Sequence, residues 1–167
     1  ACRVLAKSKP ALHVDISSSL YFVATASAFV PIDFYDYRPA RLGLSGLRTE
    51  HADLTQLHFP NGSIDSLSCM HVVEHVGLGR YGDPIDYDGD LKAVAELQRV
   101  LKPGGQLLFV VPMGGVSRIQ FNAHRIYRYG LVMQMFAGFE LIEFSLIPDD
   151  GRIHGLISPA TQEQADA

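Results

Sequence analysis

Hydrophobic residues are grouped along the chain in short runs, and the spacing within each run separates expected strands from expected helices. Nearly continuous apolar runs of about four to eight residues are typical of strands buried on both faces of a parallel sheet. Apolar positions that recur every three or four residues indicate amphipathic helices. The pattern predicts strands at 11–16, 30–36, 47–53, 64–71, 106–111, 139–147 and 152–158, and helices at 17–29, 90–101 and 125–137.

Turn-forming residues separate these runs. Pro60-Asn61-Gly62 precedes the 64–71 run, Lys102-Pro103-Gly104-Gly105 stops the helix at 90–101, and Asp149-Asp150-Gly151 separates the last two strands. Strands that alternate with helices favour a doubly wound, mostly parallel sheet, here seven-stranded, with the two final strands as an antiparallel edge hairpin. Ligands of such α/β sheets bind beyond the carboxyl ends of the strands. We therefore expect functional residues directly after the first five strands.

Composition and charge narrow the class of protein. The chain has 167 residues, 47% of them hydrophobic, and a formal net charge of -4, so we expect one globular domain over 1–160 followed by a polar, frayed tail at 161–167. The acidic balance disfavours general nucleic-acid binding, although a local basic patch stays compatible with it. The longest apolar run, 20–30, is interrupted by Thr25 and Ser27 and is too short to span a bilayer.

The cysteines and the first residue bear on the cellular setting. Cys2 and Cys69 lie far apart, and Cys69 sits inside an apolar run, which favours reduced thiols and a cytoplasmic location. The chain opens at Ala1 and reaches a strand-like run almost at once. A fragment whose upstream segment is missing or processed is compatible with this start.

Three segments together carry a family resemblance. They follow one another in the order His58-Phe59-Pro60-Asn61-Gly62-Ser63-Ile64-Asp65, His71-Val72-Val73-Glu74-His75, and Glu96-Leu97-Gln98-Arg99-Val100-Leu101-Lys102-Pro103-Gly104-Gly105. In order and spacing they resemble the type 11 group of class I S-adenosylmethionine (SAM) methyltransferases. The resemblance covers about 11–112 and is closest to a poorly characterised branch. It implies a Rossmann-like methyltransferase fold, SAM as cofactor, and transfer of a methyl group to an acceptor.

The resemblance assigns residues to the nucleoside part of SAM. Asp36 closes the second expected strand about 20 residues after Asp15, the separation at which an acidic residue binds ribose hydroxyls in nucleotide-binding sheets. Asp33 is the alternative if strand alternation turns Asp36 outward. Asp53 would lie beside the adenine amino group, and Leu54 would supply a backbone donor and an apolar wall. The alternative for each aspartate is a turn or capping residue.

The first loop departs from the family pattern. The family has a glycine-rich turn after the first strand, where bare backbone approaches the cofactor, whereas this chain has Asp15-Ile16-Ser17-Ser18-Ser19-Leu20. Small serines still permit a close approach, and the resemblance assigns Asp15, Ser17 and Ser19 to cofactor binding, with serine hydroxyls at the carboxylate. The alternative is a degenerate site in a methyltransferase-like binding or scaffold domain.

His71 and His75 follow the fourth strand and are candidate general bases, and His71 is also a candidate cofactor contact. A buried structural histidine is the alternative for each. His71-Val72-Val73-Glu74-His75 also matches the H-x-x-E-H pattern of inverted zinc metallopeptidases. A zinc hydrolase is disfavoured because that site requires one helix through both histidines, whereas here they follow a strand and precede Gly77.

Two further segments have candidate roles. The segment 121–129 follows the fifth strand, where this fold places acceptor contacts, and Arg125 and Tyr127 suit a small-molecule or glycan acceptor. A solvated helix face is the alternative for Arg125. The acidic loop 83–90 faintly resembles a calcium loop, but position 97 is Leu and not the required glutamate. Asp88 or Asp90 is expected to cap the next helix instead, with a flexible lid as the functional alternative.

Overall fold

The computed structural model describes residues 1–149 and 155–166. The chain divides into two compact units, Ala1–Val111 and Pro112–Ala167, and each is described by itself. The division falls within the range 1–160 that was expected to form one domain, and that expectation stays a prediction.

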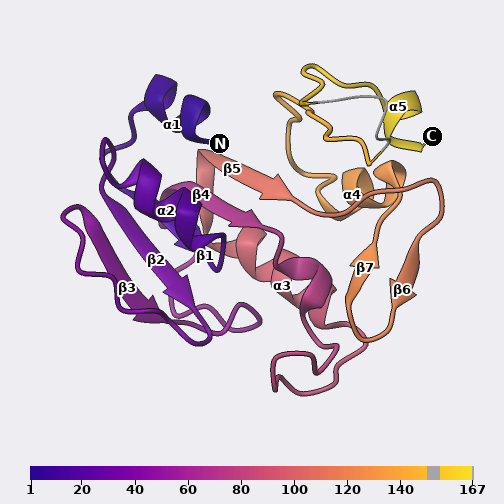
Figure 1. Cartoon of the computed structure of the whole chain (residues 1–167), viewed down its shortest axis with the longest axis horizontal. Helices are drawn as coiled ribbons and strands as arrows, with labels where there is room; N and C mark the ends of the chain where they lie inside the picture. Colours follow the sequence, from indigo (N-terminus) through magenta and orange to yellow (C-terminus); the bar gives the residue numbers. More distant parts are fainter. Residues whose placement is uncertain (150–154, 167) are drawn as a thin grey trace. The chain divides into compact units, whose positions relative to one another are not determined.

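The first unit contains a five-stranded, entirely parallel sheet (Figure 1). Its strands are β1 (His13–Ile16), β2 (Ile32–Asp36), β3 (Leu47–His51), β4 (Ile64–Met70) and β5 (Leu101–Val110), in the spatial order β3-β2-β1-β4-β5. All four residues of β1 are buried, and two of them, His13 and Asp15, are polar, so this strand is not the continuous apolar run usual for a strand buried on both faces. The strand order reverses between β1 and β4, and such a reversal creates a crevice at the carboxyl ends of the strands.

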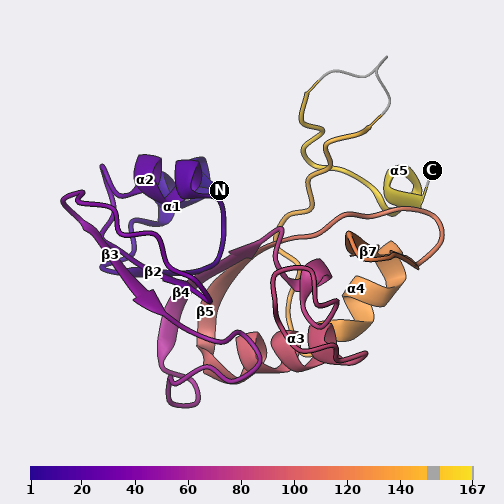
Figure 2. The same ribbon diagram turned by 60° about the horizontal axis from the view of Figure 1, so that its bottom comes forward.

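Helices cover both faces of this sheet. Figure 2 shows α1 (Cys2–Ser8) and α2 (Leu20–Ala26) on one side and α3 (Gly89–Val100) on the other. The 3₁₀-helix η1 (Val73–His75) follows β4 and packs against α3. The apolar periodicity correctly predicts a helix here, and its buried face comprises Ala93, Val94, Leu97 and Val100. Leu91 and Ala95, which belong to the same apolar pattern, are exposed. Leu5 of α1 joins the core cluster under β2, although the sequence pattern did not predict that helix.

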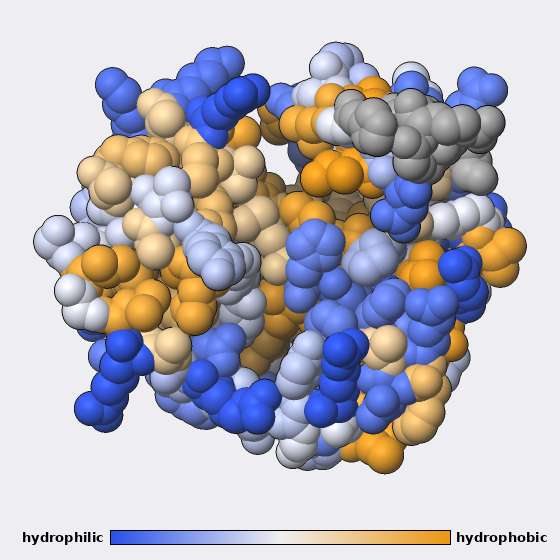
Figure 3. Space-filling view, viewed as in Figure 1, coloured by the Kyte–Doolittle hydropathy of each residue, from blue (hydrophilic) through white to orange (hydrophobic). Residues whose placement is uncertain are grey.

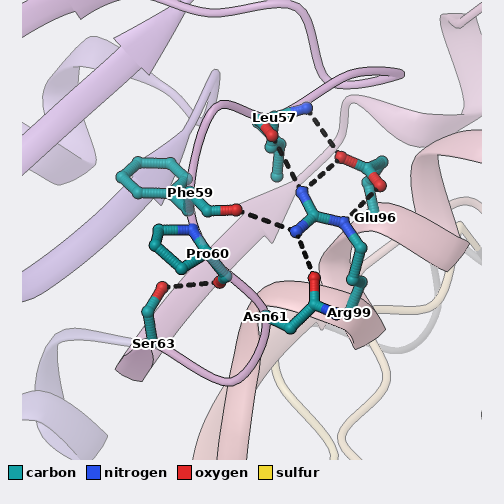
Figure 4. Close-up of polar contacts among 7 residues, drawn as sticks. All are labelled: Leu57, Phe59, Pro60, Asn61, Ser63, Glu96 and Arg99. Atoms are coloured by element: carbon teal, nitrogen blue, oxygen red, sulfur yellow. Dashed lines mark hydrogen bonds and ion pairs between the residues drawn. The ribbon is translucent and has the colours of Figure 1, made fainter.

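Hydrogen bonds from the Arg99 side chain, here called the Arg99 clasp, connect α3 to the loop before β4 (Figure 4). Nε and Nη2 of Arg99 donate to the two carboxylate oxygens of Glu96 at 2.7 and 2.8 Å. Nη1 donates to the Phe59 carbonyl and to Asn61 Oδ1, both at 2.8 Å, and Nη2 donates to the Leu57 carbonyl at 2.8 Å. One planar guanidinium therefore satisfies a loop whose carbonyls would otherwise lack partners.

The second unit begins with a small antiparallel hairpin, β6 (Arg118–Gln120) and β7 (His124–Ile126), followed by α4 (Tyr129–Met135) and α5 (Gln162–Asp166). The expected helix at 125–137 is thus wrong at its start. Arg125 and Ile126 pair with Ile119 and Arg118, so ladder formation outweighs local helical periodicity there. The tail expected to fray contains α5, which buries Ala165.

The fold class is confirmed as a mostly parallel α/β sheet with a small antiparallel hairpin, but the strands differ in detail from the expectation. Within the described ranges, the expected strands 139–147 and 152–158 contribute only one bridge, between Leu146 and Ile157, and residues 152–154 lie outside the described part. The expected turn at 102–105 instead lies within β5, which begins as soon as α3 ends. β5 is the last strand of the sheet order, where Pro103 removes no required ladder bond.

The surface of the first unit exposes both hydrophobic and hydrophilic residues on the face that Figure 3 shows, as is usual for a globular domain. Along the stretches 1–149 and 155–166, no helix has the length and apolar character needed to cross a bilayer.

Candidate functional site

A cavity of about 330 Å³ lies at the carboxyl ends of β1 to β4. All of its lining residues belong to the first unit, and each strand end contributes some of them: Ser17, Asp36, Tyr37, Arg38, Ala52, Asp53, Leu54, Thr55, His71, Val72, His75, Val76, Gly77, Tyr81, Asp83, Pro84, Asp86 and Gly89. The volume falls in the range of small-molecule pockets. The cavity therefore occupies the place that the strand order predicts for a ligand.

Ser17 brings backbone to the cavity in a conformation usual for glycine. Its φ of 58° lies in the left-handed region, which non-glycine residues seldom adopt. Its N–H donates to the Tyr35 carbonyl at 2.7 Å, and its Oγ donates to the same carbonyl at 3.3 Å. The chain thus has a serine, and not the glycine expected from the resemblance, in a left-handed conformation at the end of β1.

The other two serines do not line the cavity. The buried Ser18 hydroxyl accepts a hydrogen bond from the Met70 N–H at 3.0 Å, which links this loop to the end of β4. Ser19 is the N-cap of α2, is exposed, and makes no side-chain capping bond. The helix expected to start at Ser17 begins only at Leu20, because the left-handed residue and the cap precede it.

Asp15 lies beneath this loop and is fully buried. Its Oδ1 accepts the Ser18 N–H at 3.0 Å, and its Oδ2 accepts the Ser68 hydroxyl. Burial raises the pKa of Asp15 to about 6, although the hydrogen bonds from Ser68 and Ser18 lower it. Asp15 therefore supports the loop from below and is not among the residues that line the cavity.

His13 continues the same network inside the sheet. Its Nδ1 lies 2.8 Å from Ser66 Oγ, and its Nε2 lies 2.8 Å from Ser68 Oγ. Because Ser68 donates to Asp15, His13 Nε2–H donates to Ser68, and Nδ1 accepts from Ser66. Burial lowers the pKa of His13 to about 4, so the ring is neutral near pH 7. Sequence reasoning missed this network, whose only signal is polar residues two apart within buried strands.

Asp36 lines the cavity at the end of β2, and its role as a ribose contact stays a prediction. Its Oδ1 accepts the Arg38 N–H at 2.7 Å, and its second oxygen can accept from a ligand hydroxyl. The alternative residue, Asp33, pairs with Arg48 at 2.7 and 3.1 Å and does not line the cavity. The two aspartates are three positions apart in one strand and so point to opposite faces of the sheet.

Asp53 and Leu54 line the cavity after β3. Asp53 Oδ1 accepts both the Thr55 N–H at 2.8 Å and the Thr55 hydroxyl at 2.7 Å, which is the turn role weighed for this residue. Leu54 is buried and forms an apolar wall beside it. A polar edge beside an apolar wall is the pairing that a planar base requires.

His71, Glu74 and His75 form a cluster after β4. His71 has a φ of 61°, and its Nδ1 lies 3.4 Å from Glu74 Oε1. His75 Nε2 lies 3.8 Å from the same oxygen. Glu74 is 1% exposed, and burial raises its pKa to about 7. Both histidines line the cavity, and Glu74 lies behind them.

The geometry does not support the zinc interpretation of this segment. His71 follows a strand and His75 ends a 3₁₀-helix, so the two do not share one α-helix. Within residues 1–149 and 155–166, no group of three or more His, Cys, Asp and Glu side chains is arranged to hold a metal ion.

The loop after η1 folds over the cavity around one carboxylate. Asp83 Oδ2 accepts the N–H groups of Gly77 and Gly79 at 2.9 and 3.3 Å, and Oδ1 accepts that of Tyr81 at 3.1 Å. Gly77 has a φ of 78°, and a Cβ there would overlap the Asp86 carbonyl, so only glycine fits. The Asp83 carboxylate thus accepts hydrogen bonds from the backbone of its own loop.

Helix α3 begins differently from the expectation for its acidic start. Asp88 is the N-cap residue but makes no side-chain capping bond, and its N–H donates to Asp86 Oδ1 at 3.1 Å. Asp86 also pairs with Lys92 at 2.5 Å. The turn before α3 is therefore organised by Asp86 and not by a side-chain cap.

A family model described as "Caenorhabditis protein of unknown function, DUF268" matches residues 47–154. The chain belongs to this family. The matched range includes β3, β4, the cavity loop and the Arg99 clasp. No match was found among curated proteins.

Solved structures share the fold of this DUF268 protein. A protein from Bacillus halodurans C-125, assigned as a methyltransferase, is 20% identical with a TM-score of 0.61 over 87% of this chain and 72% of its own. The YcgJ protein of Bacillus subtilis is 21% identical with a TM-score of 0.60 over 82% of this chain and 66% of its own. A SAM-dependent methyltransferase from Aquifex aeolicus is 14% identical with a TM-score of 0.51 over 82% and 77%. The fold is that of class I SAM-dependent methyltransferases.

The two residues predicted to contact the acceptor lie outside the first unit. Arg125 belongs to β7, and Tyr127 follows it; their exposed fractions are 5% and 3%. Neither lines the cavity. Their assignment as acceptor contacts stays a prediction.

The cavity also contains residues that sequence reasoning did not single out. Among them are Tyr37, Arg38, Thr55 and Tyr81. The Tyr81 ring lies edge-on to His75 at 5.6 Å between centroids, and the Arg38 guanidinium lies 5.7 Å from the Tyr81 ring centre. Their only sequence signal is position, since all of them follow expected strand ends.

Proposed function

We propose that this DUF268 protein is a SAM-dependent methyltransferase that acts on a small-molecule or glycan acceptor by direct, in-line transfer. The observation that carries the proposal is the cavity itself. It lies at the strand-order reversal of a methyltransferase fold, and its lining follows the cofactor order of that fold: Ser17 after β1, Asp36 at β2, and Asp53 with Leu54 after β3.

The lining residues fit the chemical groups of SAM. Asp36 would accept the ribose hydroxyls, Asp53 would lie by the adenine amino group, and Leu54 would pack on the base. The left-handed Ser17 opens the end of β1 for the amino-acid part. The acidic lining suits a cofactor that carries a sulfonium and an ammonium charge. SAM supplies an electrophilic methyl group that needs no metal and no covalent enzyme intermediate.

The chain's own contribution to chemistry would come from the end of β4. His71 and His75 line the cavity, and a hydroxyl or amine acceptor must lose a proton as it is methylated. Either imidazole could take that proton.

Cys2 and Cys69 are both free thiols, which supports the proposed cytoplasmic location.

Calorimetric titration with SAM and with S-adenosylhomocysteine tests the proposal. We expect saturable binding, and Asp36→Ala should weaken it about 10- to 100-fold, since hydrogen bonds to a charged group contribute about 1.5–3 kcal/mol. Asp33→Ala is the matched control, because it removes a carboxylate from the same strand outside the cavity. Its affinity should stay within about twofold of wild type.

Two results would count against the proposal. No binding at millimolar SAM would reject the enzyme and leave a degenerate methyltransferase-like fold. Equal affinities for Asp36→Ala and wild type would reject the ribose assignment. Binding without methyl transfer to any of a panel of small-molecule and glycan acceptors, followed with methyl-labelled SAM, would favour the scaffold alternative.

A further inference from the structure

Glu74 carries a carboxyl group that is almost fully buried behind the two histidines of the cavity lining. It is 1% exposed, and its Oε2 has no hydrogen-bond partner among the described residues. A buried, unsatisfied carboxylate oxygen costs free energy that an apolar residue of similar size would not cost. Such a group is therefore a candidate for a functional role.

The position of Glu74 is defined by the two histidines in front of it. Its Oε1 lies 3.4 Å from His71 Nδ1 and 3.8 Å from His75 Nε2. Both rings line the cavity, whereas Glu74 does not. With Nδ1 of His71 directed at the carboxylate, Nε2 is the ring nitrogen that remains for an acceptor. His75 instead directs Nε2 toward Glu74 and places its ring against Tyr81.

We propose that Glu74 is a positioning residue: its buried carboxylate orients His71 and stabilises the positive charge that His71 gains when it takes the acceptor's proton. This inference rests on the proposed methyltransferase function. As the acceptor's oxygen or nitrogen bonds to the methyl carbon, the bond from that carbon to sulfur breaks, and the sulfur keeps the electron pair as a neutral thioether. The proton leaves the acceptor for His71 Nε2, so no further reactant is required.

The electrostatics agree with this geometry. Burial raises the pKa of Glu74 to about 7, although a hydrogen bond from its own backbone amide lowers it. Near pH 7 the carboxyl group is thus balanced between its two protonation states, and a proton arriving on His71 favours its charged form. The other titratable groups nearby are His75, the buried Cys69 thiol on β4, and Asp90, the buried carboxyl of the adjoining α3.

Nuclear magnetic resonance of the histidine rings tests the proposal without an acceptor. In wild type, the neutral His71 ring should carry its proton on Nδ1, because that nitrogen faces Glu74 Oε1 at 3.4 Å. In Glu74→Gln this preference for the Nδ1–H tautomer, read from the ring ¹⁵N signals, should be lost, because a neutral amide accepts a hydrogen bond more weakly than a carboxylate. Glu50→Gln is the matched control: it makes the same chemical change at an exposed residue of β3 outside the cavity. It should leave the tautomer unchanged. An unchanged tautomer in Glu74→Gln would overturn the inference.

A second measurement on the wild-type protein keeps the test valid if Glu74→Gln does not fold. The ¹⁵N signals of the neutral His71 ring should show the proton on Nδ1, as a hydrogen bond from that nitrogen to Glu74 requires. A neutral ring with its proton on Nε2 would overturn the inference.

Calorimetry with SAM separates this inference from the function on which it rests. Glu74→Gln should bind SAM within about twofold of wild type, since Glu74 does not line the cavity. Loss of SAM binding in this variant alone would show a structural role and overturn the inference. Absence of SAM binding in wild type would reject the proposed function itself.

Discussion

At the scale of single residues, two buried side chains of the sheet have pKa values shifted in opposite directions, and one serine hydroxyl forms hydrogen bonds with both. Ser68 bridges His13, whose pKa burial lowers to about 4, and Asp15, whose pKa burial raises to about 6. The ordinary values are 6.5 and 3.8, so each shift corresponds to about 3 kcal/mol at about 1.4 kcal/mol per unit.

The two shifts have opposite effects on stability as pH falls. The unfolded chain binds more protons at His13 between pH 6.5 and about 4, so the free energy of unfolding decreases over that window. The folded chain binds more protons at Asp15 between pH 6 and 3.8, so the free energy of unfolding increases there. In wild type the two contributions largely cancel.

Substitution of either residue should leave only the pH dependence of stability that the other residue contributes. Relative to wild type, Asp15→Asn should lose about 3 kcal/mol of unfolding free energy as pH falls from 6 to 4, because only the His13 contribution remains. His13→Asn should gain a similar amount over the same range. Urea unfolding at a series of pH values measures both curves, and Glu74 contributes equally to all three proteins. Two curves of the same sign would refute the account.

At the level of residues, position in the sequence alone was enough to predict which strand-end residues line the cavity. Asp36, Asp53 and Leu54 could be predicted to line a cavity because each follows a strand of a parallel sheet. Their roles as ligand contacts stay predictions. The His13 and Asp15 network could not be predicted, since it depends on the register that places Asp15 opposite Ser68. Apolar periodicity defines strands but not the register between distant ones.

At the scale of elements, the turn before β4 depends on one side chain of the neighbouring helix. Arg99 donates five hydrogen bonds to that turn and to Glu96, and Glu96 Oε2 also accepts the Leu57 N–H at 2.7 Å. The E-x-x-R spacing of the family pattern thus has a physical reason. Residues three apart in a helix lie on the same face, where both can reach the turn.

Replacing Arg99 by Lys should destabilise the first unit by about 2–3 kcal/mol, because a lysine can keep its charge beside Glu96 but cannot donate to both loop carbonyls at once. Urea unfolding measures the change. Lys102→Met is the control from the same motif: it removes an ion pair with Asp65 whose side chains are 52% and 70% exposed. That change should cost less than about 1 kcal/mol. Equal losses for both variants would contradict the clasp.

Element prediction was accurate in the first unit and poor in the second for a physical reason. The strands of the parallel sheet, such as β2 and β4, contain buried apolar residues that the sequence pattern detects even between polar ones. The segment 125–137 has a helical pattern, yet its first residues pair with β6, and such pairing depends on contacts outside the segment. The short helix α1 was missed because only Leu5 is buried along it.

At the scale of the whole molecule, the carboxyl ends and the amino ends of the parallel strands in the first unit differ chemically. The carboxyl ends of its strands carry the cavity. Gly62, in the turn before β4, and Gly104, near the start of β5, lie on the amino-end side of these strands, and neither lines the cavity. This polarity follows from a parallel sheet whose strand order reverses once.

Hydrogen exchange with and without S-adenosylhomocysteine should reveal this polarity. At a ligand concentration about 100 times the dissociation constant, amides of the loops 17–19, 36–38, 52–55 and 71–77 should exchange up to about 100-fold more slowly. Amides at Gly62 and Gly104 serve as the internal control and should change little. Protection at the amino-end turns but not at the cavity loops would place the ligand elsewhere.

The left-handed backbone at Ser17 also bears on how this loop could have changed during evolution. A serine held at a φ of 58° has a strain that a glycine at the same position would not have, on the order of 1 kcal/mol. The path of the chain is therefore compatible with either residue, and an exchange between them alters stability slightly without rerouting the loop. Serine and glycine can therefore replace each other at this position in a single substitution. The identity of this residue is thus a weak marker of whether a relative retains its cofactor.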